Sequence, residues 1–277
     1  MNITEIKDIN DERVAVYTRY NEPQLLHINE PAPGIFIAET PMVIDRAIKY
    51  GARPLSFFVE EETLGTEAAV ALLESANGGT DTGPVVYTAA HSVIGAITGY
   101  NLTRGMLAAF ERPELPDVRK LLGEASCVAV LENVVNPTNL GAIFRSAAAL
   151  GVDAVLVTRD SADPFYRRAA RVSMGTVFQV PWTYLPVDKN MTDILHEAGF
   201  YVISMALTPD AVPLTDSTLL EGDKRAIVFG TEGTGLTDAT LVGSDRICII
   251  PMHNGVDSLN VAASSAVAFW ELCGKHK

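Results

Sequence analysis

Three short segments of the chain combine glycine or small residues with polar side chains that can do chemistry. They cover residues 136–145, 230–236 and 250–260. Each segment follows a predicted strand, and open α/β sheets bind ligands at that end of their strands. The spacing therefore predicts that the three segments contribute to a ligand site.

The first segment places Asn139, Gly141 and Arg145 at the start of a predicted helix. Gly141 and Arg145 are four residues apart and share a helix face. Long helical side chains lean toward the N-terminus, so Arg145 is expected to reach back over Gly141 toward the loop that holds Asn139. An arginine on an apolar helix face needs a function or a partner. A reactive group and a structural pair with Glu132 both stay open on this segment alone.

The second segment, residues 230–236, carries three glycines around Glu232. Glycines allow backbone N–H groups to approach a ligand closely. The segment lacks the Lys-Ser/Thr ending of a P-loop, and its spacing differs from the dinucleotide-binding pattern. For a lone glycine-rich loop, a tight strand-to-helix turn is the more common explanation.

The third segment, residues 250–260, leads into the last predicted helix. Asp257 or Ser258 is expected to cap this helix, which would place Asn260 in its first turn. Capping accounts for one of these polar residues but not for all of them. His253 is interpreted as a solvated loop histidine and not as a base.

A weaker signal is the local group of Arg167, Arg168 and Arg171. It fits a patch that contacts phosphates. A solvated helix face fits it equally well.

Other chemistries find no support in the sequence. There is no G-x-S-x-G or H-E-x-x-H motif. Cys127, Cys248 and Cys273 are isolated from one another along the chain, so we expect neither a disulfide framework nor a zinc site. No metal is predicted.

The elements that must position these segments form two predicted domains, residues 1–122 and 123–277, with the boundary in the proline-rich, charged stretch 111–125. The first is a small α/β unit with expected strands at 34–39, 55–61 and 84–89, expected helices at 41–51 and 66–76, and further segments at 92–100 and 105–111. Thr40 is the expected cap of the helix at 41–51.

The second domain has a sharper pattern of apolar strands and helices. Strands are expected at 127–134, 154–159, 201–207, 226–230 and 246–252, and helices at 138–150, 191–198, 237–243 and 258–273. Apolar strands separated by helices indicate a parallel sheet that is covered on both faces.

Composition sets further bounds. Hydrophobic residues make up 48% of the 277 residues, which excludes a disordered chain. Lys and Arg number 21 against 34 Asp and Glu, a net charge of −13 that argues against a broad, sequence-independent nucleic-acid binder. There is no signal-peptide pattern and no apolar run of about 18–20 residues, so we expect a soluble cytoplasmic protein with no membrane partner.

Together and in this order, the segments resemble the motifs of the SpoU-type branch of the SPOUT RNA methyltransferases. The family pattern N-x-G-x-x-x-R is matched by Asn139, Gly141 and Arg145. The pattern G-x-E-G-x-G-L is matched by residues 230–236, with Thr231 where members often have Asn, Ser or Ala.

The remaining family patterns, I-P-M and S-L-N-V, are matched by residues 250–252 and 258–261. Residues 171–175 also look like the R-x-S-x-G stretch that the family carries between the first two motifs. The resemblance covers roughly residues 125–273, and the combination is far more specific than any one motif. The first ~120 residues are more loosely similar to a ribosomal-protein-like substrate-binding domain.

The resemblance implies a fold and a cofactor. The fold is a SPOUT α/β domain whose C-terminal segment is threaded into a trefoil knot, preceded by a small α/β substrate-binding domain. The cofactor is S-adenosylmethionine, bound in the knot by residues that match the family positions: Gly230, Ile250 and Leu259, with Ala206 and Leu207 at a neighbouring strand end. Family members form homodimers through the knot region.

The resemblance also implies methyl transfer to a ribose 2′-hydroxyl of ribosomal or transfer RNA. The implied catalytic set is Arg145, Asn139, Glu232, Ser258 and Asn260. A guanidinium is a poor base. We therefore expect Arg145 to orient the hydroxyl and to stabilise the developing alkoxide, with a substrate phosphate as proton acceptor.

Two alternatives remain from the sequence: a non-catalytic RNA-binding protein with the same fold, and an α/β enzyme that binds a nucleotide phosphate at residues 230–236. If RNA is the partner, the acidity confines its contacts to a few arginines, Arg145 and the group Arg167, Arg168 and Arg171. The prediction is weak non-specific affinity and engagement of one particular RNA fold.

Overall fold

The computed structural model describes residues 2–77, 83–95 and 105–273. It divides into unit 1, Met1–Glu114 with Phe165–Phe178, and unit 2, Leu115–Pro164 with Gln179–Lys277. The sequence placed a boundary after residue 122, whereas the division falls between Glu114 and Leu115. Helix α7 (Val118–Glu124) explains the difference, because its Leu121 and Leu122 are buried in the core of unit 2.

Unit 1 is built on a mixed sheet of five strands in the order β1-β4-β3-β5-β2. The strands are β1 (Ile3–Glu5), β2 (Ile35–Glu39), β3 (Pro54–Glu60), β4 (Val85–Ala89) and β5 (Met106–Glu111). The pairs β1–β4 and β3–β4 are parallel, while β5 runs antiparallel to β3 and β2. Residues 96–100 of the predicted segment 92–100 lie outside the described residues.

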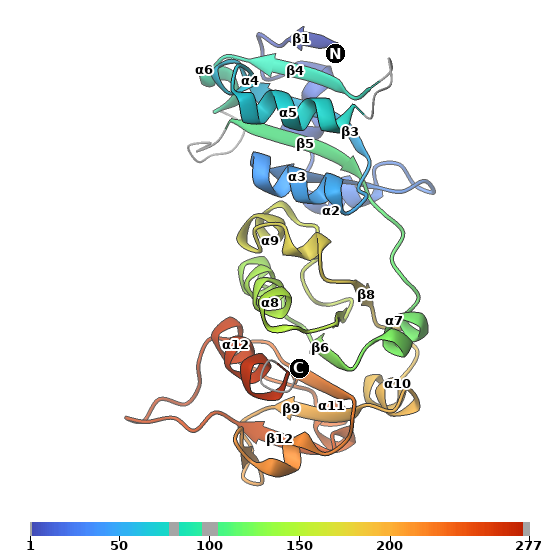
Figure 1. Cartoon of the computed structure of the whole chain (residues 1–277), viewed down its shortest axis with the longest axis vertical. Coiled ribbons are helices and arrows are strands. Elements are labelled where there is room, and N and C mark those ends of the chain that lie inside the picture. Colours follow the sequence, from blue (N-terminus) through green and yellow to red (C-terminus); the bar gives the residue numbers. More distant parts are fainter. Residues whose placement is uncertain (1, 78–82, 96–104, 274–277) are drawn as a thin grey trace. The chain divides into compact units, whose positions relative to one another are not determined.

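Short helices cover this sheet (Figure 1). They are η1 (Glu12–Val14), α1 (Ala15–Thr18), α2 (Glu22–His27), α3 (Pro41–Lys49), α4 (Glu61–Leu64), α5 (Glu67–Ala76), α6 (His91–Ile94), α9 (Arg167–Val172) and η2 (Thr176–Phe178). Thr40 is the N-cap residue of α3 as predicted, but its side chain makes no capping hydrogen bond and its φ is 79°.

Residues 165–178 belong to unit 1 although they follow the first two strands of unit 2 in the chain. Phe165 stacks on Phe36 of β2 with ring centroids 5.0 Å apart, and Phe178 stacks on Phe165 at 5.6 Å. Helix α9 lies against β2. Aromatic burial of this kind stabilises the segment by several kcal/mol, on the order of 1.5–3 for each ring.

Unit 2 contains a sheet of seven strands, and every pair in it is parallel. The order is β10-β12-β9-β11-β6-β7-β8. The strands are β6 (Cys127–Leu131), β7 (Ala154–Val157), β8 (Trp182–Tyr184), β9 (Tyr201–Met205), β10 (Val212–Pro213), β11 (Arg225–Phe229) and β12 (Arg246–Ile249). The predicted parallel sheet is confirmed, and the short edge strands β8 and β10 are additions to it.

Helices cover both faces of this sheet, as expected for parallel strands. Besides α7, they are α8 (Pro137–Leu150), α10 (Met191–Glu197), η3 (Ser217–Leu220), α11 (Asp238–Gly243) and α12 (Val261–Leu272). Val128 and Val130 pack with α7 and α10 in one core. On the other face, Phe229 meets Phe269 of α12 edge-on at 5.4 Å, and α12 packs along α8.

The end of α12 is tied to the start of β6. The structure joins Cys127 and Cys273 in a disulfide, with Cα atoms 6.3 Å apart across 146 residues of sequence. The expectation that no cysteines pair was therefore wrong. It rested on sequence spacing, whereas the fold brings Cys273, just after α12, beside Cys127 at the start of β6.

Among the described residues, the structure contains no helix with both the length and the apolar character that a membrane crossing requires.

Candidate cofactor pocket and RNA-binding residues

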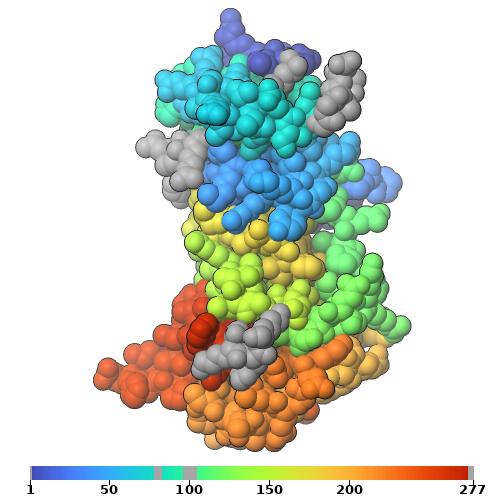
Figure 2. Space-filling view, viewed as in Figure 1, coloured from blue at the N-terminus to red at the C-terminus, as the bar shows by residue number. Residues whose placement is uncertain are grey.

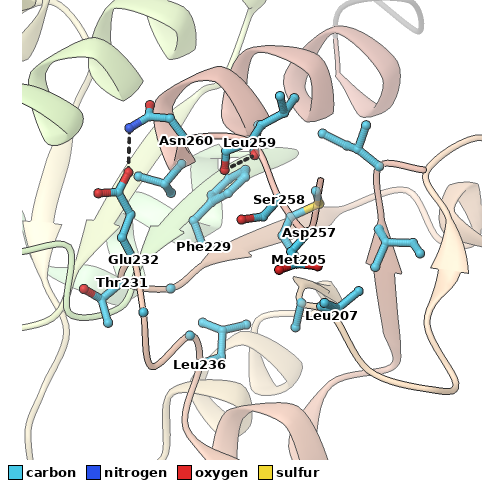
Figure 3. A pocket seen from close by; sticks show the side chains of 18 of the residues that line it. Met205, Leu207, Phe229, Thr231, Glu232, Leu236, Asp257, Ser258, Leu259 and Asn260 are labelled. Carbon is cyan, nitrogen blue, oxygen red and sulfur yellow. Dashed lines mark hydrogen bonds between the residues drawn. The ribbon is translucent and has the colours of Figure 1, made fainter. Parts of the chain in front are cut away.

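A pocket of about 870 Å³ lies in unit 2 at the carboxyl ends of β9, β11 and β12 (Figure 3). Its walls are the loop after β9, the loop 230–236 after β11, and the segment between β12 and α12. Carboxyl ends of neighbouring parallel strands are where α/β sheets bind ligands. The volume lies within the range of about 300–1,000 Å³ that small-molecule sites occupy.

The loop 230–236 depends on its glycines. A Cβ at Gly230 would stand 2.6 Å from the backbone carbon of Gly235 and 2.8 Å from the nitrogen of Leu236. Gly233 and Gly235 have φ values of 102° and 71°, which L side chains rarely adopt. Glycine at these positions therefore lets the loop fold back on itself beside the pocket.

Asn260 is the N-cap of α12, since its Oδ1 accepts from the backbone N–H of Ala262 at 3.0 Å. The sequence had placed Asp257 or Ser258 at the cap, so that prediction is wrong. The helix begins three residues later than expected because Asn260 offers an amide oxygen at the position where the helical backbone starts.

The amide nitrogen of Asn260 joins two more predicted residues. It donates to Asn139 Oδ1 at 3.0 Å and to Glu232 Oε1 at 2.5 Å. An amide has two N–H donors, so these two bonds use both of them while the carbonyl oxygen caps the helix, and together they set the orientation of the amide. Figure 3 shows Glu232 and Asn260 pointing toward one another at the rim of the pocket. Residues from all three sequence segments thus meet at one side chain.

All five predicted cofactor residues line the pocket: Gly230, Ile250, Leu259, Ala206 and Leu207. So do Glu232, Ser258 and Asn260 of the predicted catalytic set, while Asn139 reaches it through Asn260.

The charged side chains that line the pocket are acidic. Glu232 and Asp257 are its lining residues with formal charges, and no Lys, Arg or His is among the lining residues the structure describes. Two carboxylates without a neighbouring cation favour a positively charged ligand and disfavour a phosphate.

Thr208 and Cys248, on the β9 and β12 side of the pocket, are among the lining residues that the sequence did not single out. Thr208 lines the pocket, and its buried Oγ1 has no hydrogen-bond partner. Cys248 forms part of the wall, and burial raises the pKa of its thiol to about 12, so it stays neutral. The available signal was position: Thr208 follows the expected strand 201–207, at the end where ligands bind.

Arg145 does not lie on a buried face, which corrects the sequence interpretation. Leu140, Ile143, Phe144 and Ala147 form the buried stripe of α8, while Arg145 is exposed. Within the described residues it makes no hydrogen bond or ion pair, and it is not among the pocket-lining residues. Its guanidinium is therefore available to a ligand that approaches from solvent.

The alternative partner of Arg145, Glu132, does not pair with it. Glu132 is 8% exposed, and its Oε2 has no hydrogen-bond partner. Its backbone N–H continues the sheet by donating to the carbonyl of Phe229 at 2.9 Å.

The predicted RNA-binding arginines lie in unit 1. Arg167 Nε is 3.6 Å and Arg171 Nη1 is 3.4 Å from Glu39 Oε2. The solvated-face interpretation is therefore incomplete, because two of the three guanidiniums share a buried carboxylate. Arg168 is exposed on the same helix. No group of three or more potential metal ligands occurs in the part of the chain that the structure covers.

Comparison with known proteins places the chain in a family. The model of the SpoU rRNA Methylase family matches residues 126–270. An uncharacterized tRNA/rRNA methyltransferase of Mycobacterium bovis is 36% identical over 272 residues, which span 98% of this chain and 92% of the relative. The chain belongs to the SpoU rRNA methylase family, and its curated relatives are RNA methyltransferases.

More distant relatives have defined reactions in their names. A 23S rRNA guanosine 2′-O-methyltransferase, RlmP of Bacillus subtilis, is 29% identical over 197 residues, covering 70% of this chain and 75% of the relative. Among solved structures, an AdoMet-bound rRNA methyltransferase from Sinorhizobium meliloti has a TM-score of 0.79 at 21% identity, covering 97% of both chains. This likeness confirms the predicted fold class, a SPOUT-type α/β domain with a parallel sheet, preceded by a smaller α/β domain.

Proposed function

We propose that this protein transfers the methyl group of S-adenosylmethionine to a ribose 2′-hydroxyl of a structured ribosomal or transfer RNA. The observation that carries the proposal is the pocket at the ends of β9, β11 and β12, with its two carboxylates and no cation among the described lining residues. The names of RlmP and the other 2′-O-methyltransferase relatives support the choice of the hydroxyl.

The residues of the pocket fit S-adenosylmethionine. Gly230 lets the loop 230–236 fold tightly at the edge of the pocket, because a Cβ there would overlap the backbone of Gly235 and Leu236. Glu232 and Asp257 suit a ligand with sulfonium and ammonium charges, and the unpartnered Oγ1 of Thr208 can take a polar group. When bound, this cofactor supplies an electrophilic methyl group together with its leaving group.

Arg145 is the residue proposed to act on the RNA hydroxyl. Its exposed guanidinium, with five N–H donors and no competing protein partner among the described residues, can orient the 2′-oxygen and stabilise the negative charge that develops on it. A guanidinium is a poor base, so a phosphate of the RNA is the proposed proton acceptor.

The network around Asn260 is proposed to hold the reacting groups in register. Asn139 sits on the first turn of α8, the helix that carries Arg145, and it is bonded to Asn260 at the start of α12. Glu232, on the cofactor loop, is bonded to the same amide. Asn139 and Asn260 are thus positioning residues, and Ser258 lies in the pocket wall next to them.

We also propose a homodimer through the region of α12. Figures 1 and 2 show the segment after β12 (red-orange) projecting from unit 2. Its Val256 and Leu259 are 52% and 40% exposed, and Val267 and Trp270 on α12 are 40% and 54% exposed. Exposed apolar side chains that include a tryptophan are typical of interfaces. Sedimentation equilibrium should give twice the chain mass for the wild type and a monomer for Trp270→Glu.

The decisive experiment uses purified protein, S-adenosylmethionine labelled in its methyl group, and rRNA and tRNA from cells that lack the gene. We expect label in RNA, released after nuclease digestion as one 2′-O-methylated nucleoside and mapped by mass spectrometry. Label on a base would reject the hydroxyl as acceptor. Cofactor and RNA binding without transfer would instead support a non-catalytic RNA-binding protein.

A further inference from the structure

Unit 1 gathers four arginines from two distant parts of the sequence. Three lie on α9: Arg167, Arg168 and Arg171. The fourth is Arg46 of α3, whose Nη1 donates to the carbonyl oxygen of Met174 at 2.6 Å, just beyond the end of α9. The N–H of Met174 in turn donates to the carbonyl of Arg171 at 3.0 Å. These four residues are called the arginine cluster below.

A buried carboxylate organises the cluster. The side chain of Glu39, at the end of β2, is 7% exposed and lies within 3.6 Å of Arg167 Nε and 3.4 Å of Arg171 Nη1. Arg167 and Arg171 are four residues apart on one helix, where like charges repel. Glu39 offsets this repulsion and holds both guanidiniums on one side of α9. A buried carboxylate would in turn be costly without them.

The guanidiniums keep donors for a further partner. Glu39 is the one partner of the Arg171 side chain in the described chain, at 3.4–3.5 Å, and that side chain is 43% exposed. A guanidinium has five N–H donors, so several on Arg171 face solvent. The second nearby carboxylate, Glu22, accepts from the backbone N–H of Arg167 at 2.8 Å. Arg167 and Arg171 share the single carboxylate of Glu39, so this pair brings a positive charge to the surface of a chain whose net charge is −13.

We propose that the arginine cluster binds the phosphodiester backbone of RNA, with Arg168 and Arg171 in contact and Glu39 and Arg46 as positioning residues. The proposal rests on RNA being the substrate, as proposed above. The planar guanidinium matches the oxygens of a phosphate, and paired guanidiniums fit successive phosphates better than separate surface charges do. Backbone contacts hold RNA without choosing a base. The cluster therefore captures RNA on unit 1, whereas the modified nucleotide is chosen elsewhere.

The test measures binding of the full-length protein to 23S rRNA transcribed in vitro, over a series of salt concentrations. For Arg171→Gln we expect affinity about 5–20-fold lower and a slope of log K against log salt reduced by about 0.7–0.9, the value of one lost phosphate contact. The matched control is Arg53→Gln, since Arg53 is also an exposed arginine of unit 1 but pairs with Glu111. Its slope should equal the wild-type slope.

Glu39→Gln separates a positioned site from a simple positive surface. The substitution raises the net charge by one unit, so a diffuse electrostatic surface would bind RNA more tightly. A site that needs Glu39 to orient two arginines would bind more weakly, which is our expectation. Tighter binding would overturn the positioning role of Glu39.

Separate controls test whether each variant folds and whether the wild type transfers methyl groups. Thermal unfolding midpoints show whether each variant folds, and Arg168→Gln, at an exposed position, is the second variant should Arg171→Gln unfold. If Arg171→Gln and Arg168→Gln both bind RNA with the affinity and salt slope of Arg53→Gln while the wild type methylates RNA, the site is rejected and the proposed function stands. If the wild type binds with the expected slopes but transfers no label, the site stands and the proposed function fails.

Discussion

The pocket of unit 2 and the arginine cluster of unit 1 both join residues that are far apart in sequence, but by different means. The pocket is assembled from backbone turns and short polar side chains, and the Asn260 amide makes three hydrogen bonds of 2.5–3.0 Å. The cluster is assembled from long cationic side chains around Glu39 at 3.4–3.6 Å. Short hydrogen bonds fix the shape of the pocket before a ligand binds, which suits a small cofactor. Looser contacts between charges suit a flexible polyanion.

The largest expected effect is at Arg145, which belongs to neither region. Arg145→Ala should lower the rate of methyl transfer by on the order of 10²–10³-fold, since it removes the donor that stabilises the developing alkoxide. S-adenosylmethionine affinity, measured by calorimetry, should stay within about twofold, because Arg145 does not line the pocket. Loss of both would show that Arg145 is needed for the fold of the site and would reject the proposed role.

Gly230→Ala should affect the pocket without touching the arginine cluster. The new Cβ would overlap the backbone of Gly235 and Leu236, and overpacking of this kind costs about 1–3 kcal/mol. Cofactor affinity should fall about 10–100-fold. The control is Gly123→Ala in α7, where a Cβ meets no atom within 4 Å. Equal affinities for the two variants would mean that the loop adapts and that its shape is not preformed.

Asn260→Asp breaks the hydrogen-bond network while keeping the helix cap. The carboxylate can still cap α12, but it has no N–H to give to Asn139 and it repels Glu232. Methyl transfer should fall about 10–100-fold, in line with about 1.5–3 kcal/mol for a hydrogen bond to a charged group. Asn260→Ala should in addition destabilise the protein by about 1 kcal/mol through the lost cap, seen in urea unfolding. Full activity of Asn260→Asp would remove the network from the mechanism.

The smallest effect concerns the apolar wall of the pocket. Burial raises the pKa of the Cys248 thiol to about 12, so the folded state favours the protonated form. This contribution to stability is complete below the pKa of the unfolded thiol, about 8.5, and is lost as the pH rises toward 12. Iodoacetamide at pH 8 should therefore label Cys248 slowly in the folded protein and rapidly in urea. Fast labelling of the folded protein would mean that the wall opens to solvent.

The two regions also differ in how far the sequence predicts them. Asn139, Glu232 and Asn260 were predicted together, because short motifs after apolar strands report on strand ends that a parallel sheet brings to one edge. The predicted helix cap and the predicted buried position of Arg145 were wrong, since each depends on placing a residue to within one to three positions along a helix, which periodicity does not resolve. Arg46 and Glu39 carry no motif, and nothing local links them to residues 167–171.

By itself, the sequence determined the alternation of strands and helices, the parallel sheet of unit 2 and the loops that must border a ligand, because these follow from local hydrophobic patterns and from glycine. The tertiary structure alone decided that Phe165–Phe178 packs in unit 1, that Cys127 meets Cys273, and that Glu39 gathers two arginines. These are contacts between side chains more than a hundred residues apart. These contacts are stabilised by burial and charge pairing that arise only when distant parts of the chain come together in the fold, so no single stretch of sequence predicts them.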